Sequence, residues 1–147
     1  MRKPRVLFVC IGNSARSQMA EAWLRKLASD RFEPLSAGTH PIGVHPLTIE
    51  TMREVGADIS DARSKGVADL PGPFEHVVTT CAEAEADCPN LRGTISTEHW
   101  HVPDPVGRAA LVGNRAQGLE IFRRARDTVE RQVRQLLKKL EKETPAR

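Results

Sequence analysis

The segment Cys10–Arg16 constrains this chain more than any other part of its sequence. It reads Cys-Ile-Gly-Asn-Ser-Ala-Arg, follows the apolar run 6–9 and leads into a helical pattern. A turn placed between a buried strand and a helix points successive backbone N–H groups, and the positive end of the helix, at one position. We therefore predict an oxyanion site whose binding residues are Ile11, Gly12, Asn13, Ser14, Ala15 and Arg16.

Two side chains of this segment add chemistry to the turn. The planar guanidinium of Arg16 can hold two oxygens of a tetrahedral oxyanion. The same positive field favours the thiolate form of Cys10, which makes this cysteine a candidate nucleophile. The pattern alone also fits a buried structural cysteine with Arg16 on the surface, but its placement between a strand and a helix favours the anion site.

Strand and helix patterns alternate along the 147 residues, which predicts one α/β domain over residues 1–147, with a four-stranded parallel sheet flanked by helices. We expect strands at 5–10, 32–37, 75–81 and 94–102, and helices at 17–28, 46–55, 82–88 and 119–142. Residues 103–118 are expected to form a loop. Within this loop, Asp104-Pro105 is a turn signal or, near an oxyanion, a source of a general acid. The site should lie beyond the carboxyl ends of the strands.

Composition and charge exclude several classes of protein. No apolar stretch approaches the ~20 residues that span a bilayer, and the apolar run after the basic N-terminus is too short for a signal peptide. The formal charge of +3 suits a small anionic substrate. The basic residues late in the chain alternate with acidic ones, as on a solvated helix face. We expect a cytoplasmic monomer that binds neither membranes nor nucleic acid.

Three cysteines, Cys10, Cys81 and Cys88, argue against a structural disulfide framework and for redox or metal chemistry. If the segment between the last two is helical, their Cα atoms are about 10.5 Å apart, whereas a disulfide needs roughly 4.4–6.8 Å. A Cys81–Cys88 disulfide would therefore require the short helix to melt. The alternatives are two unrelated cysteines, or a zinc site completed by His99 and His101, whose spacing does not match common zinc modules.

These motifs together resemble the thioredoxin-coupled arsenate reductases, which have the Rossmann-like fold of the low-molecular-weight protein tyrosine phosphatases. The resemblance covers nearly the whole chain and runs through residues 10–21, 36–38, 78–81, 88–89, 98–100 and 104–105. It implies reduction of arsenate to arsenite, with thioredoxin as the electron donor. For this chain we expect no bound cofactor and no metal. A low-molecular-weight thiol with a glutaredoxin-like protein is the alternative donor.

The resemblance also implies roles for the residues around the oxyanion. Cys10 would attack arsenate as a thiolate, while Arg16 and the loop amides hold the anion. Ser17 would hydrogen-bond the Cys10 sulfur. Asp104 would protonate the departing hydroxide.

A relay of disulfides would follow, again as the resemblance implies. Cys81 would attack Cys10, which releases arsenite and leaves a Cys10–Cys81 disulfide. Cys88 would resolve this bond and form a Cys81–Cys88 disulfide on a melted segment that thioredoxin can reduce. The seven-residue spacing of Cys81 and Cys88 fits this scheme.

A low-molecular-weight phosphatase that hydrolyses aryl phosphates through a phosphocysteine is the main alternative function. It would need Cys10, Arg16 and Asp104 but would not use the other two cysteines. Tyrosine phosphatases of this fold usually carry aromatic residues after their Asp-Pro, whereas Val106-Gly107 follow here and the chain has no Tyr. A non-enzymatic zinc-binding or basic binding module is a more distant alternative.

The chain departs from the family at a cation site. Members often bind potassium with residues that match Asn13, Glu21, Ser36 and two further positions, which here are Arg63 and Lys65. Two positive side chains do not suit a cation site. We expect Lys65 to supply the charge itself, by pairing with Glu21 and steadying Asn13.

Overall fold

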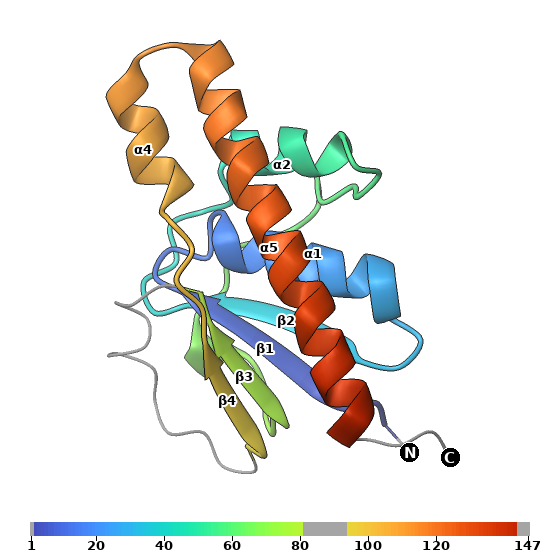
Figure 1. Ribbon diagram of the computed structural model, residues 1–147. Coiled ribbons are helices and arrows are strands. Elements are labelled where there is room, and N and C mark those ends of the chain that lie inside the picture. The colour runs from blue at the N-terminus through green and yellow to red at the C-terminus, as the bar shows by residue number, and fades with distance from the viewer. Residues whose placement is uncertain (1, 81–93, 144–147) are drawn as a thin grey trace.

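The computed structural model describes residues 2–80 and 94–143 and shows a four-stranded parallel sheet with helices packed against it (Figure 1). The strands, in the spatial order β2-β1-β3-β4, are β1 (Arg5–Cys10), β2 (Glu33–Gly38), β3 (His76–Thr79) and β4 (Ser96–His99). The helices are α1 (Arg16–Ala28), α2 (Pro46–Arg53), α4 (Pro105–Val112) and α5 (Arg115–Glu143), with a short 3-10 helix η1 (Val67–Asp69). The predicted fold class is confirmed.

Strand β1 is the centre of the sheet, and its apolar run is buried on both faces. Val6 and Phe8 belong to the large hydrophobic core that α1 and α5 complete, and the Phe8 ring packs on Trp100 at a centroid distance of 5.7 Å. Leu7 and Val9 pack into a second, smaller core on the opposite face. A continuous apolar run is typical of a parallel strand covered on both sides. Residues that complete the second core are Cys10, Ala37, Phe74 and Val77.

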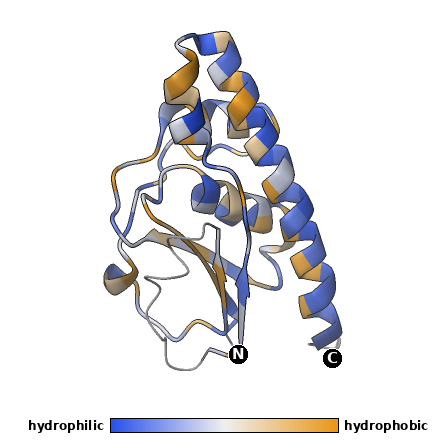
Figure 2. Ribbon diagram, turned by 60° about the vertical axis from the view of Figure 1, so that its left-hand side comes forward, coloured by the Kyte–Doolittle hydropathy of each residue, from blue (hydrophilic) through white to orange (hydrophobic). Residues whose placement is uncertain are grey.

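Helix α5 lies across one face of the sheet and carries the predicted amphipathic pattern, with hydrophobic residues recurring along a largely hydrophilic helix (Figure 2). It begins at Arg115, earlier than the expected start at 119, because the Asn114 side chain accepts a hydrogen bond from the Gln117 N–H at 2.9 Å. Trp23 of α1 donates its indole N–H to the Arg126 carbonyl at 3.1 Å, which joins the two helices. The buried residues of the apolar stripe include Phe122, Ala125, Val129, Val133, Leu136 and Leu140.

The expectation of a loop over 103–118 is wrong. Helix α4 occupies Pro105–Val112, and the first turn of α5 follows. Asp104 caps α4, Pro105 takes its first position, and Gly113 ends it in the left-handed conformation at φ 68°. The turn signals at both ends of this segment are therefore helix start and stop signals.

Two strands are shorter than expected, because β3 and β4 have four residues each. The helix expected at 82–88 lies outside the described residues. Within residues 2–80 and 94–143, no helix is both long and apolar enough to cross a bilayer. All four strands run parallel, so their carboxyl ends share one edge of the sheet, and Cys10 lies at that edge.

Candidate functional site

Cys10 is the last residue of β1, where the chain turns toward α1, and the residue is almost fully buried at 3% exposure. The Asn13 N–H donates a hydrogen bond to the Cys10 sulfur at 3.1 Å, and the Ser17 hydroxyl shares a hydrogen bond with it at 2.9 Å. Donors directed at a sulfur stabilise its thiolate, which is the nucleophilic form. The arrangement therefore suits Cys10 to attack an electrophile in front of the loop.

Asn13 holds the loop in shape from behind. Its backbone has φ 49°, the left-handed region that Asn tolerates better than most residues. Its side-chain N–H donates to Ser17 Oγ at 2.8 Å, and its side-chain oxygen accepts from Gln18 Nε2 and from the Lys65 N–H, both at 2.9 Å. Asn13 is fully buried and does not line the cavity. We predicted it as an anion ligand, whereas its N–H donates to Cys10.

Gly38, the last residue of β2, lets the strand approach this loop. A Cβ atom at Gly38 would lie 2.4 Å from the Ile11 carbonyl oxygen and 2.9 Å from the Asn13 nitrogen. Both atoms belong to the backbone, so neither could move aside cheaply. The glycine is therefore required for the loop to rest against the sheet.

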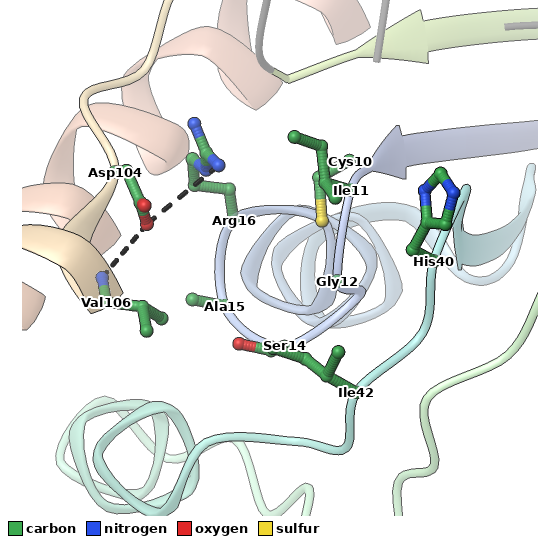
Figure 3. A pocket seen from close by; sticks show the side chains of 10 residues that line it. All are labelled: Cys10, Ile11, Gly12, Ser14, Ala15, Arg16, His40, Ile42, Asp104 and Val106. Carbon is green, nitrogen blue, oxygen red and sulfur yellow. Dashed lines mark hydrogen bonds and ion pairs between the residues drawn. The ribbon is translucent and has the colours of Figure 1, made fainter. Parts of the chain in front are cut away.

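A cavity of about 230 Å³ opens in front of the Cys10 sulfur (Figure 3). Five of the six predicted anion-binding residues line it, together with Cys10 and Asp104. Ala15 is the N-cap residue of α1 and provides no side-chain cap, so first-turn N–H groups of that helix can receive an anion. The full lining is Cys10, Ile11, Gly12, Ser14, Ala15, Arg16, His40, Ile42, Asp104 and Val106.

Arg16 and Asp104 meet at one side of the cavity (Figure 3). Arg16 Nη1 donates to the Val102 carbonyl at 3.0 Å, and its Nη2 lies 3.9 Å from Asp104 Oδ1. The same Asp104 oxygen accepts from the Val106 N–H at 3.0 Å, which caps α4. The Asp104 side chain is half exposed, so it can exchange protons with solvent. The cavity thus combines a thiol, a guanidinium and a carboxyl group, which suits nucleophilic attack on an oxyanion with acid assistance.

Three residues that were not predicted as site residues, His40, Ile42 and Val106, also line the cavity. The N–H groups of His40 and Ile42 donate to the carbonyls of Ile11 and Gly12 at 2.8 and 3.0 Å. One signal could have placed these two residues here: they follow β2, which was predicted to lie in the same parallel sheet as Cys10. Ile42 is 73% exposed, so its side chain is free to contact a bound molecule.

The residues that match the family's cation site do not fit a potassium ion. Lys65 Nζ lies 3.9 Å from Glu21 Oε1 and donates to the Arg63 carbonyl at 2.8 Å. The Ser36 hydroxyl donates to the same Glu21 oxygen at 2.7 Å. The expected pairing of Lys65 with Glu21 is confirmed, and it places a positive charge beside this carboxylate.

Cys81 and Cys88 lie outside the described residues, so the predicted relay and the alternative zinc site are not placed. His99 Nδ1 shares a hydrogen bond with Thr79 Oγ1 at 2.6 Å, and His101 is exposed. In residues 2–80 and 94–143, no group of three or more His, Cys, Asp or Glu side chains could hold a metal ion.

Comparison with known proteins finds one matching family and relatives that are arsenate reductases. The family described as low molecular weight phosphotyrosine protein phosphatase matches residues 5–146. An arsenate reductase of Staphylococcus aureus is 41% identical over 109 residues, which is 74% of this chain and 83% of that protein. A solved arsenate reductase in its oxidised state superposes with a TM-score of 0.77 at 32% identity, covering 92% of this chain and 97% of the other. A thioredoxin-dependent arsenate reductase of Corynebacterium glutamicum has a TM-score of 0.70 at 29% identity, covering 97% of this chain and 64% of that one.

Proposed function

The chain belongs to the low molecular weight phosphotyrosine protein phosphatase family and, within it, to the arsenate reductases, and we propose that it reduces arsenate to arsenite with three cysteines in series. The observation that carries this proposal is the Cys10 sulfur, which receives the Asn13 N–H and faces a cavity that Arg16 and Asp104 also line. These groups suit an oxyanion that is attacked at its central atom.

The first step is attack of the Cys10 thiolate on arsenic. The Cys10 sulfur forms a bond to As(V), and an arsenate oxygen leaves as water after Asp104 gives it a proton. Arg16 and the loop N–H groups hold the remaining oxygens and balance their negative charge. The product is a thioester of arsenate on Cys10, in which arsenic is still As(V).

The second step transfers two electrons. The Cys81 thiolate attacks the Cys10 sulfur, the sulfur–arsenic bond breaks, and its electron pair stays on arsenic, which leaves as arsenite. The sulfurs are oxidised to a Cys10–Cys81 disulfide. Cys88 then attacks Cys81, forming a Cys81–Cys88 disulfide and restoring the Cys10 thiolate. Thioredoxin supplies the two electrons that reduce the last disulfide.

The arrangement of β1 and β3 supports a reaction between Cys10 and Cys81. The two strands are adjacent and parallel, with Val9 opposite Thr79. Thr80, the residue before Cys81 in the sequence, donates its N–H to the carbonyl of Val9, the residue before Cys10, at 2.8 Å. The described chain therefore reaches Thr80 next to the strand that carries the nucleophile.

Hydrolysis of aryl phosphates is the second candidate function, because a phosphocysteine mechanism would use the same Cys10, Arg16 and Asp104 that line the cavity. Phosphorus does not accept two electrons as As(V) does, so a phosphoryl group on Cys10 would leave only by attack of water. This function would use Cys10, Arg16 and Asp104 and would have no use for Cys81 or Cys88. The roles of the two later cysteines separate the two functions.

The test is NADPH oxidation by the protein with arsenate, thioredoxin and thioredoxin reductase, compared with the Cys88→Ser variant. We expect arsenate-dependent turnover in the wild type and no multiple turnover in the variant. A Cys10→Ser variant should be inactive in every assay and serves as the blank.

Hydrolysis of an aryl phosphate is measured with the same proteins as the NADPH oxidation. Hydrolysis that Cys88→Ser leaves unchanged, without arsenate turnover, would favour the phosphatase function. Turnover with glutathione and a glutaredoxin, but not with thioredoxin, would keep the reductase and replace its electron donor.

A further inference from the structure

The outer side of the Cys10–Arg16 loop is held by a second segment, residues 39–48, which runs from the end of β2 into α2. A loop that turns its N–H groups inward turns its carbonyls outward, and each of those carbonyls needs a donor. Residues 39–48 donate to the carbonyls of Cys10, Ile11, Gly12 and Ser14, at distances between 2.8 and 3.0 Å. The donors are the N–H groups of Thr39, His40, Ile42 and His45 and the hydroxyl of Thr48.

The Ser14 carbonyl accepts two of these hydrogen bonds. The His45 N–H donates to it at 3.0 Å, and the Thr48 hydroxyl donates at 2.8 Å. The peptide bond between Ser14 and Ala15 is trans, so its C=O and N–H point in opposite directions. Holding the Ser14 oxygen outward therefore turns the Ala15 N–H inward, toward the cavity that Ala15 lines.

We propose that Thr48 is a positioning residue for the oxyanion, because its hydroxyl fixes the Ser14–Ala15 peptide with the Ala15 N–H directed at the bound anion. This inference rests on the proposed function in one respect, since it takes the cavity at Cys10 as the oxyanion site. Among the donors of residues 39–48, Thr48 is the one whose donating group is a side chain, so a substitution can remove it without breaking the backbone.

Thr48 is well placed to hold this peptide rigidly. It is fully buried in the first turn of α2. Helix α2 is fastened to α5, because Arg126 Nη1 donates to the Thr51 carbonyl at 2.9 Å and to Glu54 Oε1 at 2.8 Å. A hydroxyl on an anchored helix keeps the geometry of the groups it touches.

Loss of the Thr48 hydroxyl should weaken anion binding without changing the nucleophile. The Cys10 sulfur is held by the Asn13 N–H and the Ser17 hydroxyl, and neither group contacts Thr48 among the hydrogen bonds of the described residues. The His45 N–H, which donates to the Ser14 carbonyl at 3.0 Å, should keep this hydrogen bond in a Thr48→Val variant. We therefore expect a moderate loss of affinity that is confined to the anion.

The experiment measures binding of inorganic phosphate by calorimetry in Thr48→Val and Thr48→Ser. We expect about five-fold weaker binding in Thr48→Val, which corresponds to the net contribution of one hydrogen bond. Thr48→Ser keeps the donor and should bind like the wild type. In arsenate turnover, KM should rise by about the same factor in Thr48→Val with little change in kcat, because the Ala15 N–H contacts the anion before and during the reaction.

Thr51→Val is the matched control, since it makes the same chemical change one turn later on the same helix. Thr51 is also fully buried, but its hydroxyl donates within its own helix, to the Leu47 carbonyl at 2.7 Å and at 3.4 Å to the Thr48 carbonyl. Phosphate affinity should be unchanged in this variant. The rate of Cys10 alkylation by iodoacetamide in the absence of phosphate should be equal in all four proteins.

Three results would overturn the inference: wild-type phosphate affinity in Thr48→Val, an equal loss in Thr51→Val, or a change in Cys10 alkylation that follows the loss of affinity. Thr48→Ala replaces Thr48→Val if the latter does not fold. A wild-type protein that binds no phosphate would remove the oxyanion site, and with it both the proposed function and the role of Thr48. Normal phosphate binding with no effect of Thr48→Val would remove the role of Thr48 alone.

Discussion

The Oγ atom of Ser17 lies 2.9 Å from the Sγ atom of Cys10, and both side chains are buried. The Asn13 side chain donates an N–H to the same Ser17 oxygen at 2.8 Å. Because the Ser17 oxygen accepts that hydrogen bond, its own proton is free to be donated to the sulfur. The Ser17 hydroxyl is therefore a hydrogen-bond donor available to the Cys10 sulfur.

Ser17→Ala should slow the reaction of Cys10 with electrophiles at neutral pH by about ten-fold, since one hydrogen bond to a charged group contributes about 1.5 kcal/mol. The measurement is the rate of iodoacetamide alkylation of the reduced protein, with mass spectrometry to count only Cys10. Ser29→Ala, an exposed serine that follows the same helix, is the control and should leave the rate unchanged. An unaltered rate in Ser17→Ala would show that the Asn13 N–H alone is sufficient.

Asp104 combines two roles that a pair of variants can separate. Its carboxylate caps α4 by accepting the Val106 N–H, and the same group lines the cavity. Asn is as good an N-cap as Asp but carries no acidic proton. Asp104→Asn should therefore keep the wild-type Tm and lose about 100-fold or more in kcat.

Asp104→Ala is the companion variant. It should lose the same activity and, in addition, about 1 kcal/mol of stability, because the cap is also gone. Thermal unfolding followed by circular dichroism measures the second effect. Full arsenate turnover in Asp104→Asn would show that the proton comes from another donor.

The part of the site that is local in sequence could be predicted from the sequence. A strand, a turn with Gly12 and Asn13, and a helix follow one another directly, so the position of Cys10 and Arg16 needs no knowledge of distant contacts. The same holds for the parallel sheet, because Val6–Val9 and the strands that pair with it have patterns typical of buried strands.

The rest of the site depends on how distant segments return to the loop. His40 and Ile42 reach the cavity because β2 ends beside β1, and no motif marks them. The Asp104-Pro105 pair fits both a turn and a helix start, and only the packing of the following helix on α5 decides between them. Arg16 likewise contacts Val102, 86 residues later in the chain.

Arsenate reduction should be indifferent to potassium. Lys65 Nζ lies 3.9 Å from Glu21 Oε1, and the Lys65 N–H holds the Asn13 side chain at 2.9 Å. An ammonium group at this position repels a second cation. Turnover in KCl and in NaCl at equal ionic strength should agree within error, whereas a marked stimulation by potassium would contradict this assignment.

Lys65→Met extends the same test, because it removes the charge and keeps most of the side chain. We expect a lower Tm in this variant, since Glu21 loses one of its cationic partners, Arg25 being the other. Lys26→Met, on the exposed side of α1, is the control and should keep the wild-type Tm. If potassium, but not sodium, restored the wild-type Tm of the Lys65→Met variant, the ammonium group would be shown to replace an ion.

The ion pairs between α2 and α5 should make the free energy of unfolding decrease at acidic pH. The Arg123 side chain, through its hydrogen bonds, and to a lesser extent Arg126 lower the pKa of Glu54 from 4.5 to about 2. A carboxyl whose pKa is lower in the folded protein stabilises the fold above the unfolded-state pKa, and this contribution is lost as the pH falls from about 4.5 to about 2. Because the Glu54 side chain is 33% exposed, solvent screening limits the contribution to about 1 kcal/mol.

Glu54→Gln should therefore lower the free energy of unfolding by about 1 kcal/mol at pH 7 and by progressively less as the pH approaches 2. Urea unfolding at several pH values measures the free energy of unfolding of variant and wild type. The titration of other groups, such as Glu75, cancels in the difference between the two proteins. Glu130→Gln, which removes a surface pair with Arg134 on α5, should change stability by less than about 0.5 kcal/mol at every pH. A difference between Glu54→Gln and wild type that stays constant from pH 7 to pH 2 would mean that lost packing, and not charge, explains the effect of this substitution.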